Sequence, residues 1–405
     1  MPAFIGVTAA YWAFMLSDGA LRMLVLLHFH RLGFSPLDLA FLFLLYEIAG
    51  IITNLYAGYL ATRFGLRSTL FSGLAIQILA LAGLAMLDPS WGMGVSVAYV
   101  MGMQGASGVA KDLTKMSTKS AVKLLAPTQN AGVFRWVAAL TGSKNAIKGF
   151  GFFLGAVLLG LFGFQPTLWI MGAGLAAILV LCLIFLPAGL PAGSKGAKFS
   201  QIFAKSSNVN WLSAARVFLF GARDVWFVVA LPVFFATALK TQGWAQETSF
   251  YLTGAFMAAW VIFYGLIQAS APKILRAKTR ALTGLIWDAQ RWALIAAMIP
   301  LVLMALVWAM APGNTLALLV AIGLWGFAVV FAINSALHSY LILAFTDDTR
   351  VSMDVGFYYM ANAAGRLLGT ALSGAGFMLG GLGLCLGLSA LMLALSAILA
   401  RRLQA

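Results

Sequence analysis

Charged residues inside long apolar segments are the part of this sequence that could do chemistry. Of the 405 residues, 62% are hydrophobic and only 9% are charged. Several charged residues nevertheless interrupt apolar runs that are long enough to cross a bilayer. A charge in hydrocarbon is costly, so such a residue is a candidate functional residue by default.

Two arginines are the first candidates for substrate binding. Arg366 lies in ANAAGRLLGT, with Tyr358 and Asn362 eight and four residues earlier on the same helical face. No acid lies within one turn of it, which favours a substrate-binding role. Arg22 follows Asp18 by four residues, and this spacing allows two interpretations. The two residues form a structural ion pair, or Arg22 faces a cavity and Asp18 orients it.

Two further pairs hold basic residues close to the apolar runs. Arg223 and Asp224 are adjacent, so their side chains leave a helix about 100° apart and are expected not to pair well. Each has a possible role at the substrate. Lys144 and Lys148 share a helical face, with Lys148 expected just inside the cytoplasmic boundary. They bind substrate, or their long stems extend to the lipid headgroups.

Four lysines recur at every fourth residue in SGVAKDLTKMSTKSAVKLL. Lys119 and Lys123 are expected on a face toward headgroups or solvent. Lys111 and Lys115 lie closer to the membrane and could line a vestibule that attracts anions.

Acids at membrane depth are candidates for proton coupling. Glu47, in FLLYEIAG, has no basic partner nearby in the sequence. Desolvation there would favour the protonated carboxyl, a property that a proton-coupling site needs. The alternative is a salt bridge to a cation on a neighbouring helix. Asp18 and Asp224 are the other candidates.

The excess of deep cations over acids predicts an anionic ligand. Arginine meets phosphate or carboxylate with two parallel hydrogen bonds, so several cations suggest a multiply charged compound. The sequence contains no phosphate-binding loop, and its three histidines show no metal-ligand spacing. We therefore expect no enzyme activity, no cofactor and no metal. The net charge of +15 does not indicate nucleic-acid binding, because the basic residues lie in short segments between apolar runs.

The apolar pattern predicts an all-α membrane protein. Twelve candidate spans start near residues 4, 36, 69, 91, 130, 167, 209, 250, 291, 315, 351 and 382. The polar segment 188–208 is expected to be a cytoplasmic linker between two six-helix bundles, 1–187 and 209–405. A weak repeat, AFMLSDGALRMLVLLHFH against FLFGARDVWFVVALPVFF, aligns Asp18 with Asp224.

The distribution of basic residues predicts that both termini are cytoplasmic. On one side of the predicted membrane only Arg31 and Lys240 lie in the loops. The other side holds clusters that include the lysines from Lys111 to Lys123, the linker, residues 273–280 and the C-terminal arginines. The N-terminus lacks the pattern of a cleaved signal peptide, so the first helix is expected to be retained.

The motif GYLATRFGLRST, between the second and third spans, resembles the signature of major facilitator transporters. The residues that match are Gly58, Leu60, Arg63, Gly65 and Arg67, while Thr62 stands where the family has Asp. In the family, a Gly-containing turn lets basic side chains bond the ends of neighbouring helices across the closed cytoplasmic gate. The resemblance implies the major facilitator fold.

Longer runs carry a more specific resemblance. AYWAFMLSDGALRMLVLLHFHRLGFSPLDLAFLFLLYE, FRWVAALTGSKNAIKGFGFFLG and ANAAGRLLGTALSG resemble the organoarsenical efflux permeases of bacterial arsenic-resistance operons. This family is implied to export 1-arseno-3-phosphoglycerate across the inner membrane. Glyceraldehyde-3-phosphate dehydrogenase forms that compound from arsenate, which implies a functional partnership. We expect a monomer in contact with membrane lipids. A transporter of another phosphorylated metabolite, as an antiporter or uptake system, is the main alternative. A drug exporter fits the deep cations less well.

Overall fold

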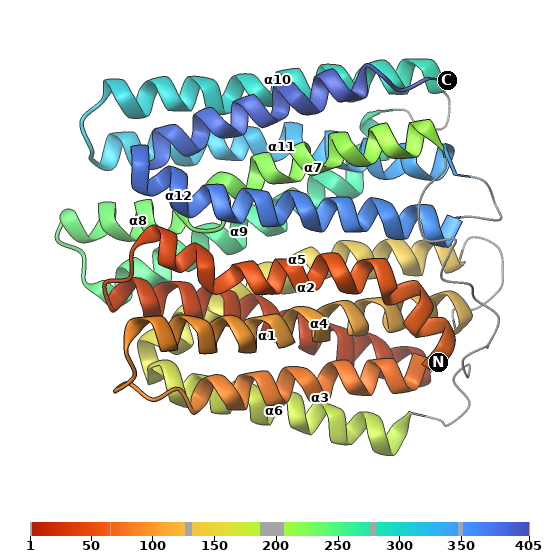
Figure 1. Ribbon diagram of the computed structural model, residues 1–405, viewed down its shortest axis with the longest axis horizontal. Helices are drawn as coiled ribbons and strands as arrows, with labels where there is room; N and C mark the ends of the chain where they lie inside the picture. The colour runs from red at the N-terminus through yellow and green to blue at the C-terminus, as the bar shows by residue number, and fades with distance from the viewer. Residues whose placement is uncertain are drawn as a thin grey trace.

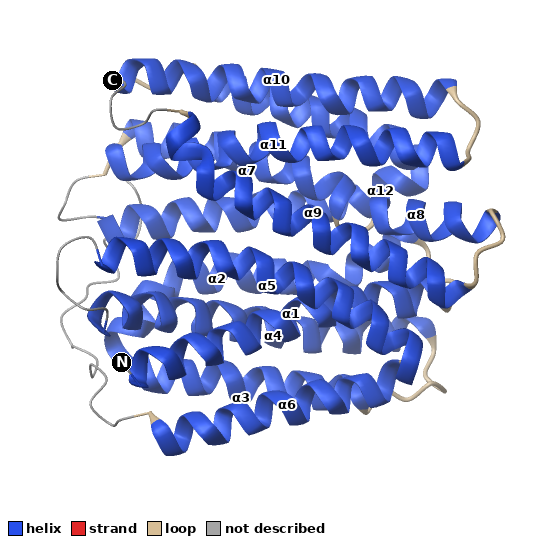
Figure 2. Cartoon of the chain, turned by 180° about the vertical axis from the view of Figure 1, so that it is seen from behind, coloured by secondary structure: helices blue, strands red, loops and turns tan. Residues whose placement is uncertain are grey.

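A computed structural model describes residues 2–64, 66–125, 132–186, 206–275, 281–346 and 351–404, and its regular structure there is entirely α-helical (Figure 2). The N-terminal half forms α1 (Pro2–Arg31), α2 (Pro36–Phe64), α3 (Leu66–Ala85), α4 (Met93–Leu125), α5 (Gly132–Phe162) and α6 (Phe164–Phe185). The C-terminal half forms α7 (Ser207–Phe227), α8 (Ala230–Thr241), α9 (Gln246–Ile274), α10 (Leu282–Ala309), α11 (Asn314–Ala344) and α12 (Val351–Ala400).

Among the described residues, ten helical segments are long and apolar enough to cross a membrane, and α4 is not one of them. Apolar segments of this length become helices because a bilayer offers no other partner for the backbone polar groups. Two short helices, α7 and α8, together form one pass, whereas α12 folds back on itself and forms two. The reversal in α12 is at Gly380 and Gly381, where Gly381 has a φ of 63° that glycine tolerates. Most passes begin within a turn of the expected residue, but the ninth begins at Leu282 rather than near residue 291.

The helices form two bundles, as predicted. Figure 1 shows α1–α6 in one bundle and α7–α12 in the other, with the N- and C-termini at the same end of the molecule. The bundles meet chiefly where α2 packs on α12 and α5 packs on α9. A side chain near either of those two contacts can therefore interact with residues of both bundles.

A break separates α7 from α8 inside the seventh pass. Pro232 lies just after the break, and proline removes a helical hydrogen bond and clashes with the preceding turn. The N–H groups of Val229 and Ala230 donate instead to the hydroxyl of Ser373 on α12, at 3.2 and 3.1 Å. This hydroxyl fixes the break without leaving buried N–H groups unpaired.

Part of the gate motif lies outside the described structure. Gly65, the surroundings of Gly58 and the side chains of Leu60 and Arg63 are not described, so the predicted contacts of the motif there are not tested. The guanidinium of Arg67 lies 5.3 Å from the centre of the Phe71 ring on the next turn of α3. Most of the predicted linker is also outside the described residues, and α7 begins at Ser207, just before the expected end of that linker.

Candidate functional site

Glu47 forms the centre of the site. Its carboxylate has no exposed surface and accepts hydrogen bonds from Arg22 of α1, at 2.9 Å, and from Arg366 of α12. The Nε of Arg366 donates to Oε2 at 2.9 Å, and its Nη2 donates to the same oxygen. Of the two predicted alternatives for Glu47, the structure has the salt bridge to neighbouring helices. It brings Arg22 and Arg366, from opposite bundles, to one carboxylate.

Asp18 does not pair with Arg22, so the interpretation of their spacing as a structural ion pair was wrong, whereas Arg22 does border a cavity. The Asp18 carboxylate binds Lys148 of α5 at 2.6 Å and accepts a hydrogen bond from the Tyr46 hydroxyl at 2.5 Å. Asp18 therefore neutralises Lys148 on α5 rather than a cation on its own helix. Arg22 forms its ion pair with Glu47 instead.

Lys148 lies in the middle of α5, which begins at Gly132. Its place just inside the cytoplasmic boundary stays a prediction, and the apolar span of α5 begins at Ser143. Here α1 packs closely on α5, because Gly19 and Gly151 meet at backbone contact. The polar residues before Lys148 extend the helix rather than ending it. Lys144, one turn earlier, is half-buried.

Two lysines of α4 are mostly buried. Lys111 is 6% exposed, its Nζ has no hydrogen-bond partner and lies 4.0 Å from the centre of the Tyr46 ring. Lys115 binds Asp112 at 3.5 Å and donates to Asn54 at 3.1 Å. Both were expected to lie closer to the membrane than Lys119 and Lys123 and to line a vestibule that attracts anions, which stays a prediction. The side chains of Lys119 and Lys123 are outside the described part.

Asp112 was missed by the sequence reasoning. It is fully buried and accepts hydrogen bonds from Thr53 and Asn54 of α2. Its spacing of three residues from Lys115 is a signal that could have identified it.

Arg223 and Asp224 do pair, contrary to the prediction. The Nε and Nη2 of Arg223 lie 2.6 and 2.5 Å from one carboxylate oxygen of Asp224. Adjacent residues of a helix do point about 100° apart at their Cβ atoms, but the long arginine side chain bends back and reaches the neighbouring carboxylate. The guanidinium lies over the Phe220 ring at 4.9 Å from its centre.

Arg216 was also missed. It lies two turns before Arg223 on α7 and is 4% exposed. Its Nε donates to Asn362 and its Nη1 to the backbone oxygen of Ser335, both at 3.0 Å. Its Cζ lies 4.9 Å from the centre of the Tyr358 ring. The predicted stripe of Tyr358, Asn362 and Arg366 therefore contacts α7 as well as α2.

The charges of these groups do not balance. Six cations pair with four carboxylates, which are Asp18, Glu47, Asp112 and Asp224. Arg216 is a seventh cation, and it bonds neutral oxygens. The cations are Arg22, Lys111, Lys115, Lys148, Arg216, Arg223 and Arg366. An excess of positive charge in a low-dielectric interior favours binding of an anion.

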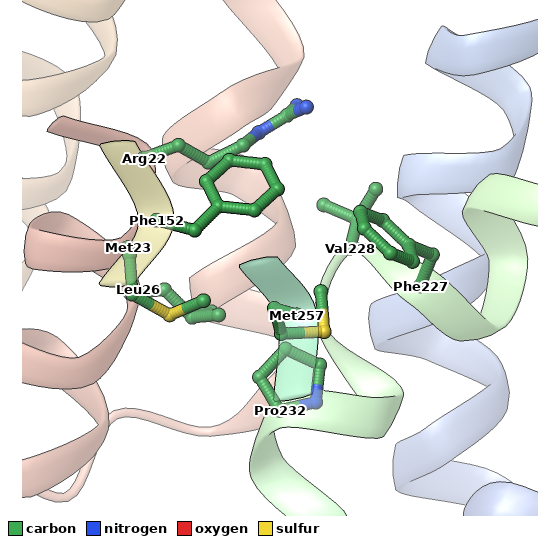
Figure 3. Close-up of a pocket in the computed structure, with 8 residues that line it drawn as sticks. All are labelled: Arg22, Met23, Leu26, Phe152, Phe227, Val228, Pro232 and Met257. Atoms are coloured by element: carbon green, nitrogen blue, oxygen red, sulfur yellow. The ribbon is translucent and has the colours of Figure 1, made fainter. Parts of the chain in front are cut away.

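A small apolar pocket adjoins Arg22 at the interface of the bundles (Figure 3). Met23, Leu26 and Phe152 line it from the first bundle, and Phe227, Val228, Pro232 and Met257 line it from the second. Its empty volume is about 220 Å³, which includes space open to solvent, and both bundles contribute to its walls.

Comparison with known proteins agrees with this architecture. The family model of the Major Facilitator Superfamily matches residues 3–287. The nucleoside transporter NupG, solved as a point mutant, superposes with a TM-score of 0.71 at 16% identity, covering 98% of each chain. A structure from work on substrate recognition in proton dependent oligopeptide transporters superposes with a TM-score of 0.70 at 13% identity, covering 98% of this chain and 97% of that one. No curated protein matches the chain. With most of its length matched by the family model, the chain belongs to the Major Facilitator Superfamily.

Proposed function

We propose that this transporter exports a small polyanion, an organoarsenical of the 1-arseno-3-phosphoglycerate type, by alternating access. The observation that carries the proposal is the sharing of Glu47 between Arg22 and Arg366. A substrate site must be reached from both bundles, and these two arginines supply one cation from each. The remaining deep cations favour a ligand with more than one negative charge.

Glu47 acts as the counter-ion of the empty site. Two guanidinium groups facing each other without an anion would repel and would carry a large desolvation cost. A substrate oxyanion offers the same acceptor oxygens as the carboxylate, so it can replace Glu47 at one or both arginines. Substrate binding then breaks the ion pair between Arg366 and Glu47, which joins the bundles, and replaces it with a contact between the arginine and the substrate.

This exchange constrains how a proton could be coupled. A proton on Glu47 would leave Arg22 and Arg366 without a counter-charge unless an anion bound at the same time. Protonation of Glu47 therefore accompanies substrate binding, so that the proton and the substrate would cross the membrane in the same direction, as in cotransport. Proton antiport needs a carboxyl that is protonated in the empty site. Asp18 and Asp224 are the other candidates for that role, and protonation of either would likewise release its own cation, Lys148 or Arg223.

The biological setting is proposed from the sequence resemblance. The transporter lies in a bacterial inner membrane, with both termini in the cytoplasm. Glyceraldehyde-3-phosphate dehydrogenase supplies the substrate when arsenate replaces phosphate. Transport of another phosphorylated metabolite, by exchange or uptake, is the second candidate, since its charges would suit the same cations. A drug exporter is disfavoured by the ionic centre.

Flux in everted membrane vesicles separates these possibilities. The vesicles are supplied with the dehydrogenase, glyceraldehyde 3-phosphate, NAD⁺ and radiolabelled arsenate, with and without a pH gradient. We expect arsenic to accumulate inside only when all components and the transporter are present. Accumulation of labelled glycerol 3-phosphate but not of arsenic would favour the second candidate. Failure of both compounds to enter would contradict anion transport.

A further inference from the structure

We infer that Arg216 forms a second anion subsite, which binds one end of a substrate whose other end is bound by Arg22 and Arg366. This inference rests on the proposed transport of an anion and specifies its ligand. The compound carries two oxyanionic groups joined by a short carbon chain.

Arg216 has the features of an unsatisfied cation. Among the described residues no carboxylate pairs with it, although it is 4% exposed. Its two hydrogen bonds go to neutral oxygens, the side-chain amide of Asn362 and the backbone of Ser335. Its Nη2 donates to no described group. A buried charge without a counter-ion is costly, so an anion would gain more here than at a paired arginine.

Two other polar side chains beside Arg216 also lack partners. The hydroxyl of Tyr358 is buried; Ser339 of α11 lies close to it, but no hydrogen bond of normal geometry joins the two. His338 of α11 is fully buried close to Arg216, and neither ring nitrogen has a partner. Buried polar groups are nearly always hydrogen-bonded, so two exceptions beside one unpaired arginine indicate a missing ligand. A hydroxyl, an imidazole N–H and a guanidinium N–H all donate, and an oxyanion accepts from each.

The position of Arg216 relative to the Glu47 centre indicates the size of the ligand. Arg216 bonds Asn362, and Arg366 follows Asn362 by one turn of α12, a rise of about 6 Å. The two guanidinium groups thus lie along one side of the same helix. A ligand that reaches both groups extends by about one turn along α12, which is the scale of a three-carbon compound with a charged group at each end.

Binding of short anions to the purified full-length protein tests the subsite. The probes are inorganic phosphate and glycerol 3-phosphate, with one oxyanionic group each, and 2,3-bisphosphoglycerate, with more than one. Affinities are measured by titration calorimetry at constant ionic strength. We expect the wild type to bind 2,3-bisphosphoglycerate more tightly than the other two probes. Arg216→Gln should lower the affinity for 2,3-bisphosphoglycerate roughly tenfold or more, because charge-assisted hydrogen bonds are lost. Inorganic phosphate and glycerol 3-phosphate each occupy one site and can still bind at Arg22 and Arg366 in the variant, so their affinities should fall less than that of 2,3-bisphosphoglycerate.

Three comparisons make the result specific. Tyr358→Phe should reduce the same preference to a smaller degree, and it replaces Arg216→Gln if that variant does not fold. Arg402→Gln removes an exposed charge, and Tyr99→Phe removes a hydroxyl that is already bonded to Gly83, so neither should change the preference. Equal weakening of all three probes by Arg216→Gln, or no preference in the wild type, would overturn the subsite while anion transport stands. If no probe binds the wild type, the proposed function itself fails.

Discussion

Arg366 of α12 donates two hydrogen bonds to the fully buried Glu47 of α2, and this ion pair joins the two bundles at their centre. Arg22 binds the other oxygen of the same carboxylate. An anion that displaces Glu47 would therefore change a contact within the first bundle and a contact between the bundles together. This relationship links occupancy of the site to the relative position of the two halves.

The first prediction concerns the two arginines. Arg22→Ala and Arg366→Ala should each abolish arsenate resistance, because losing one buried charge partner costs about 2–5 kcal/mol of binding. Resistance is measured as growth in arsenate, with membrane levels of the protein checked by immunoblot. Lysine keeps the charge but loses the bidentate geometry, so Arg22→Lys and Arg366→Lys should be less impaired. Arg401→Ala, at an exposed position, is the control. Normal resistance in either alanine variant would make that arginine structural.

The second prediction concerns Glu47. Glu47→Gln leaves two guanidinium groups without a counter-ion, which should lower the stability of the empty protein by about 3–5 kcal/mol. The same change removes the competing carboxylate, so affinity for 2,3-bisphosphoglycerate should rise while gradient-driven export falls. Thermal unfolding with and without this compound, and vesicle flux, measure the effects.

The matched control for Glu47 is Glu247→Gln, an exposed residue in the first turn of α9. It should change neither stability nor affinity. A Glu47→Gln protein that binds and transports like the wild type would show that the carboxylate does not compete with substrate.

The fold was largely predictable from the sequence because lipid imposes a simple rule. Each apolar run of about 20 residues must form a helix, so hydropathy located nearly all the passes. The ninth was misplaced, with its start expected near residue 291 rather than at Leu282. Asp288 is buried inside α10, so a polar residue facing the bundle interior did not end the helix there.

The sequence identified most charged residues of the site, but it did not predict which of them form ion pairs with one another. Depth and residue type were enough to select Glu47 and Arg366, but their pairing joins segments that are 319 residues apart. Sequence spacing predicts only contacts along one helix, and so it wrongly linked Asp18 to Arg22. Arg216 was overlooked because it lies near the start of its span, where an arginine is commonly at the membrane surface.

The third prediction concerns orientation. Both termini should be cytoplasmic, because the sequence assigns most basic loop residues to the same side of the predicted membrane as the termini. Epitope tags after residue 405 and before residue 1 should react with antibody in everted vesicles but not in intact spheroplasts. Reaction only in spheroplasts would reverse the orientation. A tag in the connection between α8 and α9, at the opposite end in Figure 1, should give the reverse pattern.

The fourth prediction concerns the break between α7 and α8. Ser373→Ala removes the acceptor for the N–H groups of Val229 and Ala230, which should cost about 1–3 kcal/mol for each group left unpaired. Thermal unfolding of the purified protein measures this loss. Ser389→Ala is the control, since Ser389 donates to the Ala222 oxygen, which lies within a helix. Equal stability of both variants would show that another group or water satisfies the break.

The last prediction concerns the contact of α2 with α12 at the end opposite the termini. A Cβ on Gly374 would press against the backbone of Pro36 and the side chain of Ala40. Since backbone cannot give way, Gly374→Ala should push these helices apart and favour the conformation that is open at this end. A cysteine at Leu37, in a protein with Cys182 and Cys385 replaced by alanine, should then react faster with a membrane-impermeant maleimide added from that side. Gly326→Ala, where a Cβ meets nothing within 4 Å, should leave the rate unchanged. An unchanged rate in Gly374→Ala would mean that this contact does not seal the site.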